Sequence, residues 1–153
     1  MALQCTLLVR VHHSLLKIIE IFFEALENGH YKCFLKPKTF LPMIYIDDCI
    51  QATIDLLNAD NAKLTRRVYN LAGISFSPEQ IAAAVKKYIP DFTIEYAPDF
   101  RQAIAETWPR SLDDTDSKND WGWTYDISIN DLAKQTIKKI DHKYKTHRKI
   151  VGV

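Results

Sequence analysis

The chain has 153 residues, of which 47% are hydrophobic and 25% are charged, and its formal net charge at pH 7 is +1. This length suits a single domain, and the composition is that of an ordinary globular protein rather than a disordered or fibrous one. The balanced charge favours no class of partner, and no apolar run approaches the ~18–20 residues that a membrane-spanning helix needs.

Cysteine and histidine patterns argue against a disulfide framework or a metal site. The chain has three cysteines, an odd number, without a Cys-x-x-Cys pair, and its five histidines form no metal-type spacing. A reducing compartment is therefore expected. Residues 138–150 hold six basic side chains and one aspartate. We expect this tail to be solvated and frayed rather than to bind nucleic acid, because it lacks interleaved aromatic residues and a recognised motif.

The first predicted element is a helix that Ser14 caps and that ends at Gly29. Its polar residues form one narrow stripe, and the remaining surface is apolar, so the helix requires partners on most sides. Residues 31–35 and 41–46 then read as extended segments. Two adjacent carboxylates follow, Asp47 and Asp48. We expect them to cap the next helix, because the side chains of adjacent residues diverge and cannot converge on one substrate atom as an acid/base pair would.

The residues after these aspartates have helical spacing, with Ile50, Ile54 and Leu57 on one face. Residues 67–73, RVYNLAG, then predict a short strand. Ser77, Pro78 and Gln80 form a capping box at the start of the next helix, which Pro90 ends.

The last part of the chain repeats this alternation. Residues 92–97 predict a strand, and Asp99 caps a helix over 99–108. An acid-capped short helix ending near Gly122 comes next, followed by an amphipathic helix over 128–140. Alternating strands and helices predict an α/β fold with at least some parallel strand pairing.

Several catalytic motifs are missing from the 153 residues. A dinucleotide-binding loop or a P-loop needs clustered glycines, whereas the four glycines here are dispersed. There is no Gly-x-Ser-x-Gly or His-Glu-x-x-His motif, and no tyrosine is followed by a lysine four residues later. The residues alone indicate a scaffold without catalytic groups.

Four segments nevertheless carry a resemblance to a known family. They are LPMIYIDDCIQATIDLL, YNLAGISFSPEQIAAAVKKYIPDF, YAPDFRQAIAETWP and KNDWGW. Together they resemble the C-terminal half of short-chain-type L-threonine 3-dehydrogenase, an epimerase-like member of the extended short-chain dehydrogenases/reductases. The likeness covers roughly residues 18–140. It implies the C-terminal part of a Rossmann-type fold, with the small substrate-binding domain and an incomplete parallel sheet.

The resemblance also implies a reaction, the oxidation of L-threonine by NAD+ to 2-amino-3-oxobutyrate in threonine catabolism, typically in mitochondria for animal members. The family's catalytic Tyr and Lys and its glycine-rich loop lie upstream of the matched segments. No catalytic or cofactor-binding residue is therefore carried over, and we expect this chain to bind NAD weakly and to be inactive alone. The helices of the family's dimer interface are expected in the same absent half.

Two residues are carried over to the substrate pocket. Trp108 matches the family tryptophan whose ring lies over the amino-acid substrate, and the alternative is an ordinary core tryptophan. Arg101 matches a helix start where related enzymes place a substrate-facing arginine, although a surface arginine is the alternative that the sequence favours. Met43 and Tyr45 are unspecific candidates for the pocket wall. The tryptophans of the WGW motif, Trp121 and Trp123, are expected to be packing residues.

This interpretation divides the chain into an unmatched segment (1–17), a substrate-side region (18–140) and a basic tail (141–153). Without the strands of the missing half, apolar surface is expected around Ile18, Ile21, Phe22 and Phe23. Two other functions remain open. One is a pseudoenzyme that binds a protein partner through this exposed helix, and the other is a fragment of a nucleotide-sugar epimerase or dehydratase.

Overall fold

The structure is a computed structural model that describes residues 19–151, with side-chain surroundings for residues 19–142. Within that range the elements are α1 (Glu20–Glu27), β1 (His30–Cys33), β2 (Leu41–Met43), α2 (Ile46–Asn58), β3 (Ile74–Phe76), α3 (Pro78–Lys86), β4 (Thr93–Tyr96), α4 (Phe100–Glu106), α5 (Thr115–Trp121) and α6 (Ile129–Val151). The alternation of helices and strands confirms the predicted α/β class.

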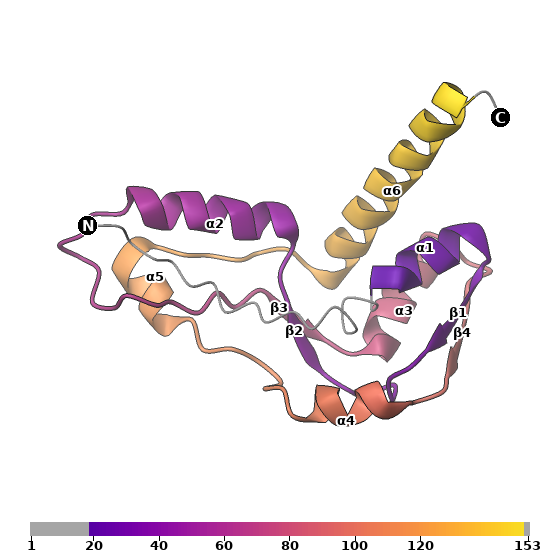
Figure 1. Ribbon diagram of the computed structural model, residues 1–153, viewed down its shortest axis with the longest axis horizontal. Coiled ribbons are helices and arrows are strands. Elements are labelled where there is room, and N and C mark those ends of the chain that lie inside the picture. Colours follow the sequence, from indigo (N-terminus) through magenta and orange to yellow (C-terminus); the bar gives the residue numbers. More distant parts are fainter. Residues whose placement is uncertain (1–18, 152–153) are drawn as a thin grey trace.

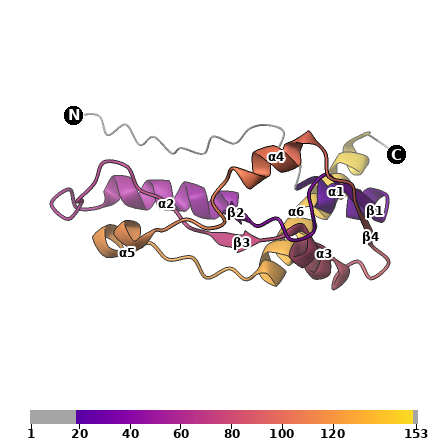
Figure 2. The ribbon, with the colours of Figure 1, turned by 90° about the horizontal axis from the view of Figure 1, so that it is seen from below.

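The described strands form two separate pairs. β1 and β4 pair in parallel, with His30 opposite Thr93, whereas β2 and β3 pair antiparallel, with Leu41 opposite Phe76. The predicted parallel pairing is therefore confirmed. Figures 1 and 2 show α1, α3, β1 and β4 at one end of the molecule and α2 with α5 at the other, with β2 and β3 between them.

The apolar core lies at the first of these ends, where α1 packs against β1, α3 and α6. Its buried side chains include Leu35, Leu41, Ile81, Val85, Phe92, Leu132 and Ala133. The expected exposure of α1 is wrong for Ile21 and Phe22, whose side chains are 1% and 5% exposed. They are covered because α3 and α6 lie against α1. Phe23 is exposed as expected, and Ile18 lies outside the described residues.

Local capping signals are confirmed at three helices. The Ser77 hydroxyl accepts a hydrogen bond from the Gln80 N–H, and the Gln80 side chain accepts one from the Ser77 N–H, which completes the capping box of α3. The Asp99 carboxylate accepts the Arg101 N–H at the start of α4. α5 ends at Gly122, whose φ of +78° lies in the left-handed region that favours glycine.

Asp47 and Asp48 do not cap α2, which corrects the prediction. The N-cap residue is Tyr45, and no side chain there accepts a backbone hydrogen bond. Because α2 begins at Ile46, both carboxylates lie inside its first turn, where the helix dipole still favours negative charge. The Asp47 carboxylate instead accepts a 2.5 Å hydrogen bond from the Lys139 ammonium group of α6.

The predicted strand over residues 67–73 is also wrong. β3 begins only at Ile74, because no described strand lies beside 67–73 to supply a hydrogen-bond ladder. Backbone carbonyls in this segment accept hydrogen bonds from side chains instead. The Ser117 hydroxyl donates to the Asn70 carbonyl at 2.5 Å, and the Trp123 indole N–H donates to the Ala72 carbonyl at 3.3 Å.

The two ends of the chain are only partly described. α6 runs to Val151, beyond the predicted end at residue 140, and the fraying of the basic tail stays a prediction. The segment 1–17, with Cys5 and the predicted helix start at Ser14, lies outside the described residues. No described helix combines the length and the apolarity that a membrane crossing needs.

Gly73 generates a testable prediction about the packing of β2. A Cβ atom at this position would lie 2.2 Å from the Met43 carbonyl oxygen and 2.9 Å from the Ile44 Cα atom, both of them backbone atoms that cannot rotate away. We expect Gly73→Ala to lower the free energy of unfolding by about 1–3 kcal/mol, as overpacking does. Urea unfolding measures the change.

Gly122→Asn is the control for this substitution. Nothing lies within 4 Å of a Cβ atom there, and asparagine tolerates a left-handed backbone. A small effect at Gly122 is therefore expected. An unchanged unfolding midpoint for Gly73→Ala would contradict the close approach of residues 43–44 and Gly73.

Candidate functional site

The two predicted pocket residues lie at opposite ends of α4. Arg101 is in its first turn, and Trp108 follows its last residue by two positions. Both side chains are half-buried, and Trp108 packs against the apolar core, as Met43 and Tyr45 do. α4 therefore separates Arg101 from Trp108, and the pocket roles of these four residues stay predictions.

Arg101 is anchored within its own region of the chain. Its guanidinium group pairs with the Asp99 carboxylate at 2.6 Å, and its central carbon lies 3.6 Å from the centroid of the Phe34 ring. The hydrogen bonds from Arg101 lower the pKa of Asp99, and those bonds raise the pKa of Arg101. With 18% of its side chain exposed, Arg101 is not a free surface residue. Its charge faces a carboxylate and an aromatic ring.

Gln102, which the sequence did not single out, fixes α4 to the loop after β1. Its side chain is 6% exposed and accepts the Lys36 N–H at 2.8 Å. The Gln102 amide group donates to the Thr39 hydroxyl at 3.0 Å and to the Glu106 carboxylate at 2.8 Å. A buried amide with donors and acceptors satisfied in this way holds the start of α4, and with it Arg101, in place.

The segment that carries Trp108 is held against the β2–β3 pair. The Arg110 guanidinium carbon lies 4.7 Å from the centroid of the Phe40 ring, just before β2. The Ser75 hydroxyl of β3 donates a hydrogen bond to the Arg110 carbonyl. These contacts hold the chain just after Trp108 beside Phe40 and β3.

A cavity of about 300 Å³ lies between α2 and residues 121–127. Its lining includes three carboxylates, an amide and three aromatic side chains, from Asp48, Gln51, Asp55, Trp121, Trp123, Tyr125 and Asp126. The two tryptophans of this wall were predicted to be packing residues, and the prediction is confirmed for Trp123, which is 6% exposed. The alternation of aromatic residues at 121, 123 and 125 is the signal that marks this cavity wall.

The rings of the cavity wall contact one another in series. The centroid distances are 6.3 Å from Tyr69 to Trp121, 5.9 Å from Trp121 to Trp123 and 6.2 Å from Trp123 to Tyr125. Three buried polar atoms at the cavity, Asp48 Oδ2, Trp121 Nε1 and Tyr125 Oη, have no hydrogen-bond partner among the described residues. Carboxylates beside aromatic faces favour a cationic group over an anionic one.

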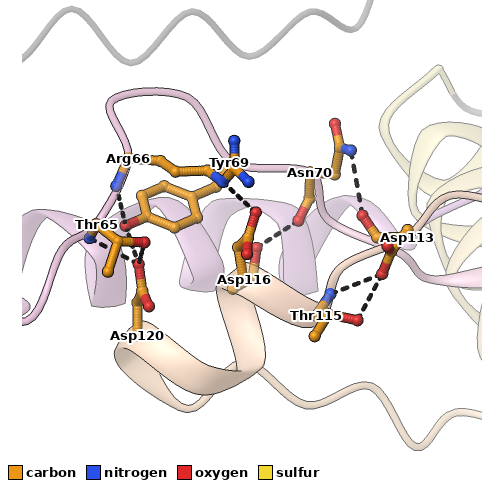
Figure 3. A network of polar contacts seen from close by, with 9 residues as sticks. Thr65, Arg66, Tyr69, Asn70, Asp113, Thr115, Asp116 and Asp120 are labelled. Atoms are coloured by element: carbon orange, nitrogen blue, oxygen red, sulfur yellow. Dashed lines mark hydrogen bonds and ion pairs between the residues drawn. The ribbon is translucent and has the colours of Figure 1, made fainter.

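A polar network joins the loop before residues 67–73 to α5 (Figure 3). The Asp120 carboxylate accepts hydrogen bonds from the Tyr69 hydroxyl at 2.5 Å and from the Thr65 N–H and hydroxyl at 2.8 and 2.7 Å. Arg66 pairs with Asp116 one turn earlier on α5. The hydrogen bonds from Tyr69 and then Thr65 lower the pKa of Asp120.

The described residues do not fit a dinucleotide. Gly29, Gly73 and Gly122 lie in three separate loops, and the space above Gly73 is filled by the backbone of Met43 and Ile44. They form no glycine-rich cradle for a pyrophosphate. Nor are three or more His, Cys, Asp or Glu side chains placed to hold a metal ion anywhere in the described part of the chain.

Comparison with known proteins identifies relatives that are longer than this chain. No protein-family model matches the chain. It is 44% identical over 116 residues to the mitochondrial L-threonine 3-dehydrogenase of Bos taurus, a match that covers 75% of this chain and 31% of the relative. It is 41% identical over 127 residues to an uncharacterized epimerase/dehydratase of Staphylococcus aureus, covering 82% of this chain and 40% of the relative.

The fold is likewise similar to a solved structure, that of L-threonine dehydrogenase from Phytophthora infestans. The TM-score is 0.79 and the identity 48%, over 81% of this chain and 40% of that protein. The chain therefore spans less than half the length of each relative it matches.

Asp120 generates a prediction about pH. Because its folded-state pKa is lowered, its contribution to stability is present above the unfolded pKa of about 3.9 and is lost as the pH falls through the folded pKa. We expect Asp120→Asn to lower the melting temperature at pH 7. The difference from the unmodified chain should shrink towards pH 3 in thermal unfolding followed by circular dichroism.

Asp48→Asn should change the melting temperature at pH 7 in the opposite direction, and it serves as a matched comparison. Burial, and then the neighbouring Asp47 charge, raise the pKa of Asp48, so its ionised form destabilises the fold above that pKa. We expect the variant to melt higher than the unmodified chain at pH 7, with the gain vanishing below about pH 4. A lower melting temperature at pH 7 would contradict the burial of Oδ2.

Proposed function

Because the chain is homologous to a region of the epimerase-like L-threonine 3-dehydrogenases and has the fold of the C-terminal part of an extended short-chain dehydrogenase/reductase, we propose that it forms the substrate-side part of an NAD-dependent enzyme that oxidises L-threonine. The observation that carries the proposal is 48% identity at a TM-score of 0.79 over 81% of the chain. In this proposal the substrate-side region spans residues 18–140, between the segment 1–17 and the basic tail 141–153.

The proposal gives Trp108 and Arg101 different tasks. The Trp108 ring would cover the aliphatic part of the amino acid, since its half-buried position on the core gives it a fixed orientation. Arg101 would attract the substrate carboxylate, in competition with Asp99, which it now contacts at 2.6 Å. Met43 and Tyr45, which pack on the same core, would complete the wall.

Hydride transfer would require groups from outside these 153 residues. NAD would accept the hydride when bound, yet the described glycines offer no place for its pyrophosphate. A tyrosine base needs a lowered pKa, whereas burial raises the pKa of Tyr31, Tyr69, Tyr96 and Tyr125. We therefore propose that this chain alone neither binds NAD tightly nor oxidises threonine.

The relatives bear on the compartment of this chain and on one of its two alternative functions. The bovine relative is named as a mitochondrial protein, so we propose a mitochondrial location. Similarity to the Staphylococcus aureus epimerase/dehydratase keeps a nucleotide-sugar reaction as a second candidate. A partner-binding role is a third, supported by apolar side chains exposed on α2.

The first test is activity of the 153-residue chain itself. With L-threonine and NAD+, no increase in absorbance at the NADH band is expected above a sample without threonine. Threonine-dependent NADH formation by the purified chain would overturn the proposed inactivity.

The second test places residues 19–140 in the matching region of the Phytophthora infestans enzyme. The chimera should form NADH with L-threonine and should not turn over UDP-sugars. Trp108→Ala should lower kcat/KM at least tenfold, about 1.4 kcal/mol, mainly through KM, and Trp108→Phe should restore most of it because a ring remains.

Phe100→Ala is the control, since Phe100 is an exposed aromatic residue at the start of α4, the helix that ends just before Trp108. Equal losses at residues 100 and 108 would argue against a pocket role for Trp108. Turnover of UDP-sugars without threonine oxidation would favour the epimerase or dehydratase alternative.

A further inference from the structure

The C-terminal half of α6 extends beyond the core. α6 is 23 residues long, and the buried apolar side chains among its described residues, Leu132, Ala133 and Ile140, all belong to its first half. The helix continues to Val151, which at 1.5 Å per residue adds about 16 Å after Ile140. Figure 1 shows this end of α6 running past α1 and away from the other labelled elements. Its surface is therefore available to a partner outside the fold.

The same end of the helix concentrates the positive charge of the chain. Residues 138–150 contain six lysines and arginines and one acid, Asp141, whereas the other 140 residues together carry a net charge of −4. A basic helix end thus extends from an acidic body. An anionic surface would attract the helix end and repel the body, so that the chain would meet such a surface with α6 first.

The basic residues of α6 are arranged along one face. Lys134, Lys138, Lys145 and Lys149 are separated by four, seven and four residues, a spacing that returns to the same side of a helix. The first two are exposed. Arg148 lies next to Lys149, and these five residues are called the basic row below. Their common face makes the charge a continuous feature of the helix.

Stabilisation of the helix end does not account for the basic row. The helix dipole favours positive charge only within the last turn, which explains Arg148 and Lys149 but not the basic residues further back. Nor is the row engaged by the ion pair that joins α6 to α2. That pair is formed by Lys139, which lies on a different face of the helix and contacts Asp47 at 2.5 Å.

The side of α6 opposite the basic row is apolar in register. α6 packs on α1 and α3 through this side, where Ile140 is buried. Tyr144 and Val151 follow Ile140 by four and eleven residues, with His147 between them, so the same side continues into the half of the helix that extends past α1. The extending half is therefore an amphipathic basic helix.

This combination favours a lipid surface over a nucleic acid. A nucleic acid would use the basic row for its phosphates but would leave the apolar side of the helix without a role. An amphipathic helix at a membrane surface uses both sides, because its basic residues meet anionic headgroups and its apolar residues enter the boundary of the acyl chains. Tyrosine, as at position 144, is also a residue that favours this boundary.

We propose that the end of α6 binds the surface of a membrane that contains anionic lipid. The basic row lies at the level of the headgroups, and the side of Tyr144 and Val151 faces the acyl boundary. The helix lies on the membrane rather than across it, since no described helix has the length and apolarity to span one. The inference does not depend on the proposed oxidation of threonine, and it concerns a surface outside both the predicted pocket and the cavity.

The test sediments the complete 153-residue chain with lipid vesicles. We expect it to bind vesicles of phosphatidylcholine that contain about one third phosphatidylglycerol, and to stay in solution with phosphatidylcholine alone. Binding should weaken as the salt concentration is raised, because the attraction between exposed charges is screened.

Lys145→Gln combined with Lys149→Gln removes two charges from the basic row. The partition coefficient onto the anionic vesicles should fall about 25-fold, or about fivefold for each charge, and glutamine keeps the helix propensity of lysine. Asp141→Asn removes the one acid that lies between the ends of the row. It should raise the partition coefficient, a gain that a folding defect would not produce.

Lys38→Gln combined with Lys63→Gln is the matched control. It removes the same number of charges from exposed positions in the turns after β1 and α2, and it should leave vesicle binding unchanged. Tyr144→Ser keeps every charge of the control chain and should still weaken binding, because the apolar side loses its ring. Circular dichroism compares the helix content of all variants.

Four results would overturn the inference. They are no binding of the unmodified chain to the anionic vesicles, equal losses in the two double variants, unchanged vesicle binding by Tyr144→Ser, and tighter binding to double-stranded RNA than to vesicles at the same phosphate concentration. The last result would make a nucleic acid the partner of the basic row.

Discussion

The packing of α6 across α1 and α3 is the interaction on which the core depends. α1 has 8 residues and α3 has 9, too few to be stable as isolated helices, and both pack against α6 as well as against each other. Leu132, Ala133 and Ile140 of α6 are buried there. Burying a large aliphatic side chain contributes about 1.5–3 kcal/mol, so a few such residues outweigh the capping contributions of these helices. α6 also reaches α2 through the pair of Lys139 with Asp47.

The opposite end of the molecule is held in a different way. α2 buries only Cys49 and Ala52, and the loop before residues 67–73 is joined to α5 through Asp120 and Arg66. The Arg66–Asp116 ion pair is exposed, and exposed ion pairs typically contribute less than about 1 kcal/mol. The end that lacks a deep apolar core is also the end where the cavity and the exposed aliphatic side chains of α2 lie. Its order therefore depends on contacts between charged side chains and between aromatic rings.

The predictions from sequence succeeded where a few neighbouring residues decide the outcome. The capping box at Ser77 and the left-handed end at Gly122 depend on local hydrogen bonds and on one backbone angle. The prediction that the aspartates after β2 cap α2 was wrong, because the helix starts one residue before them. A capping pattern in the sequence does not define a helix start to within one residue. Trp108 and Arg101 were located by resemblance, and nothing in their local sequence reveals the anchoring of Arg101 on Phe34.

The other wrong predictions concern contacts between segments that lie far apart in the sequence. Whether Ile21 and Phe22 are covered depends on α6, more than a hundred residues later in the chain, and no pattern within α1 encodes that. Residues 67–73 were predicted as a strand from their own composition, but a strand exists only beside another strand. The cavity likewise joins α2 to residues 121–127, and sequence periodicity does not report such a meeting.

The parallel pairing of β1 with β4 has a consequence for the order of folding. His30 and Thr93, which face each other in this pair, are 63 residues apart in the chain. During synthesis β1 emerges first and must wait until β2, α2, β3 and α3 have followed before its partner exists. Pairing at such a separation is slow, because the loop must close before any contact stabilises it. The antiparallel β2–β3 pair and the capped helix α3 can therefore form earlier, and the closing of β1 onto β4 is the late step that brings α1 under α6.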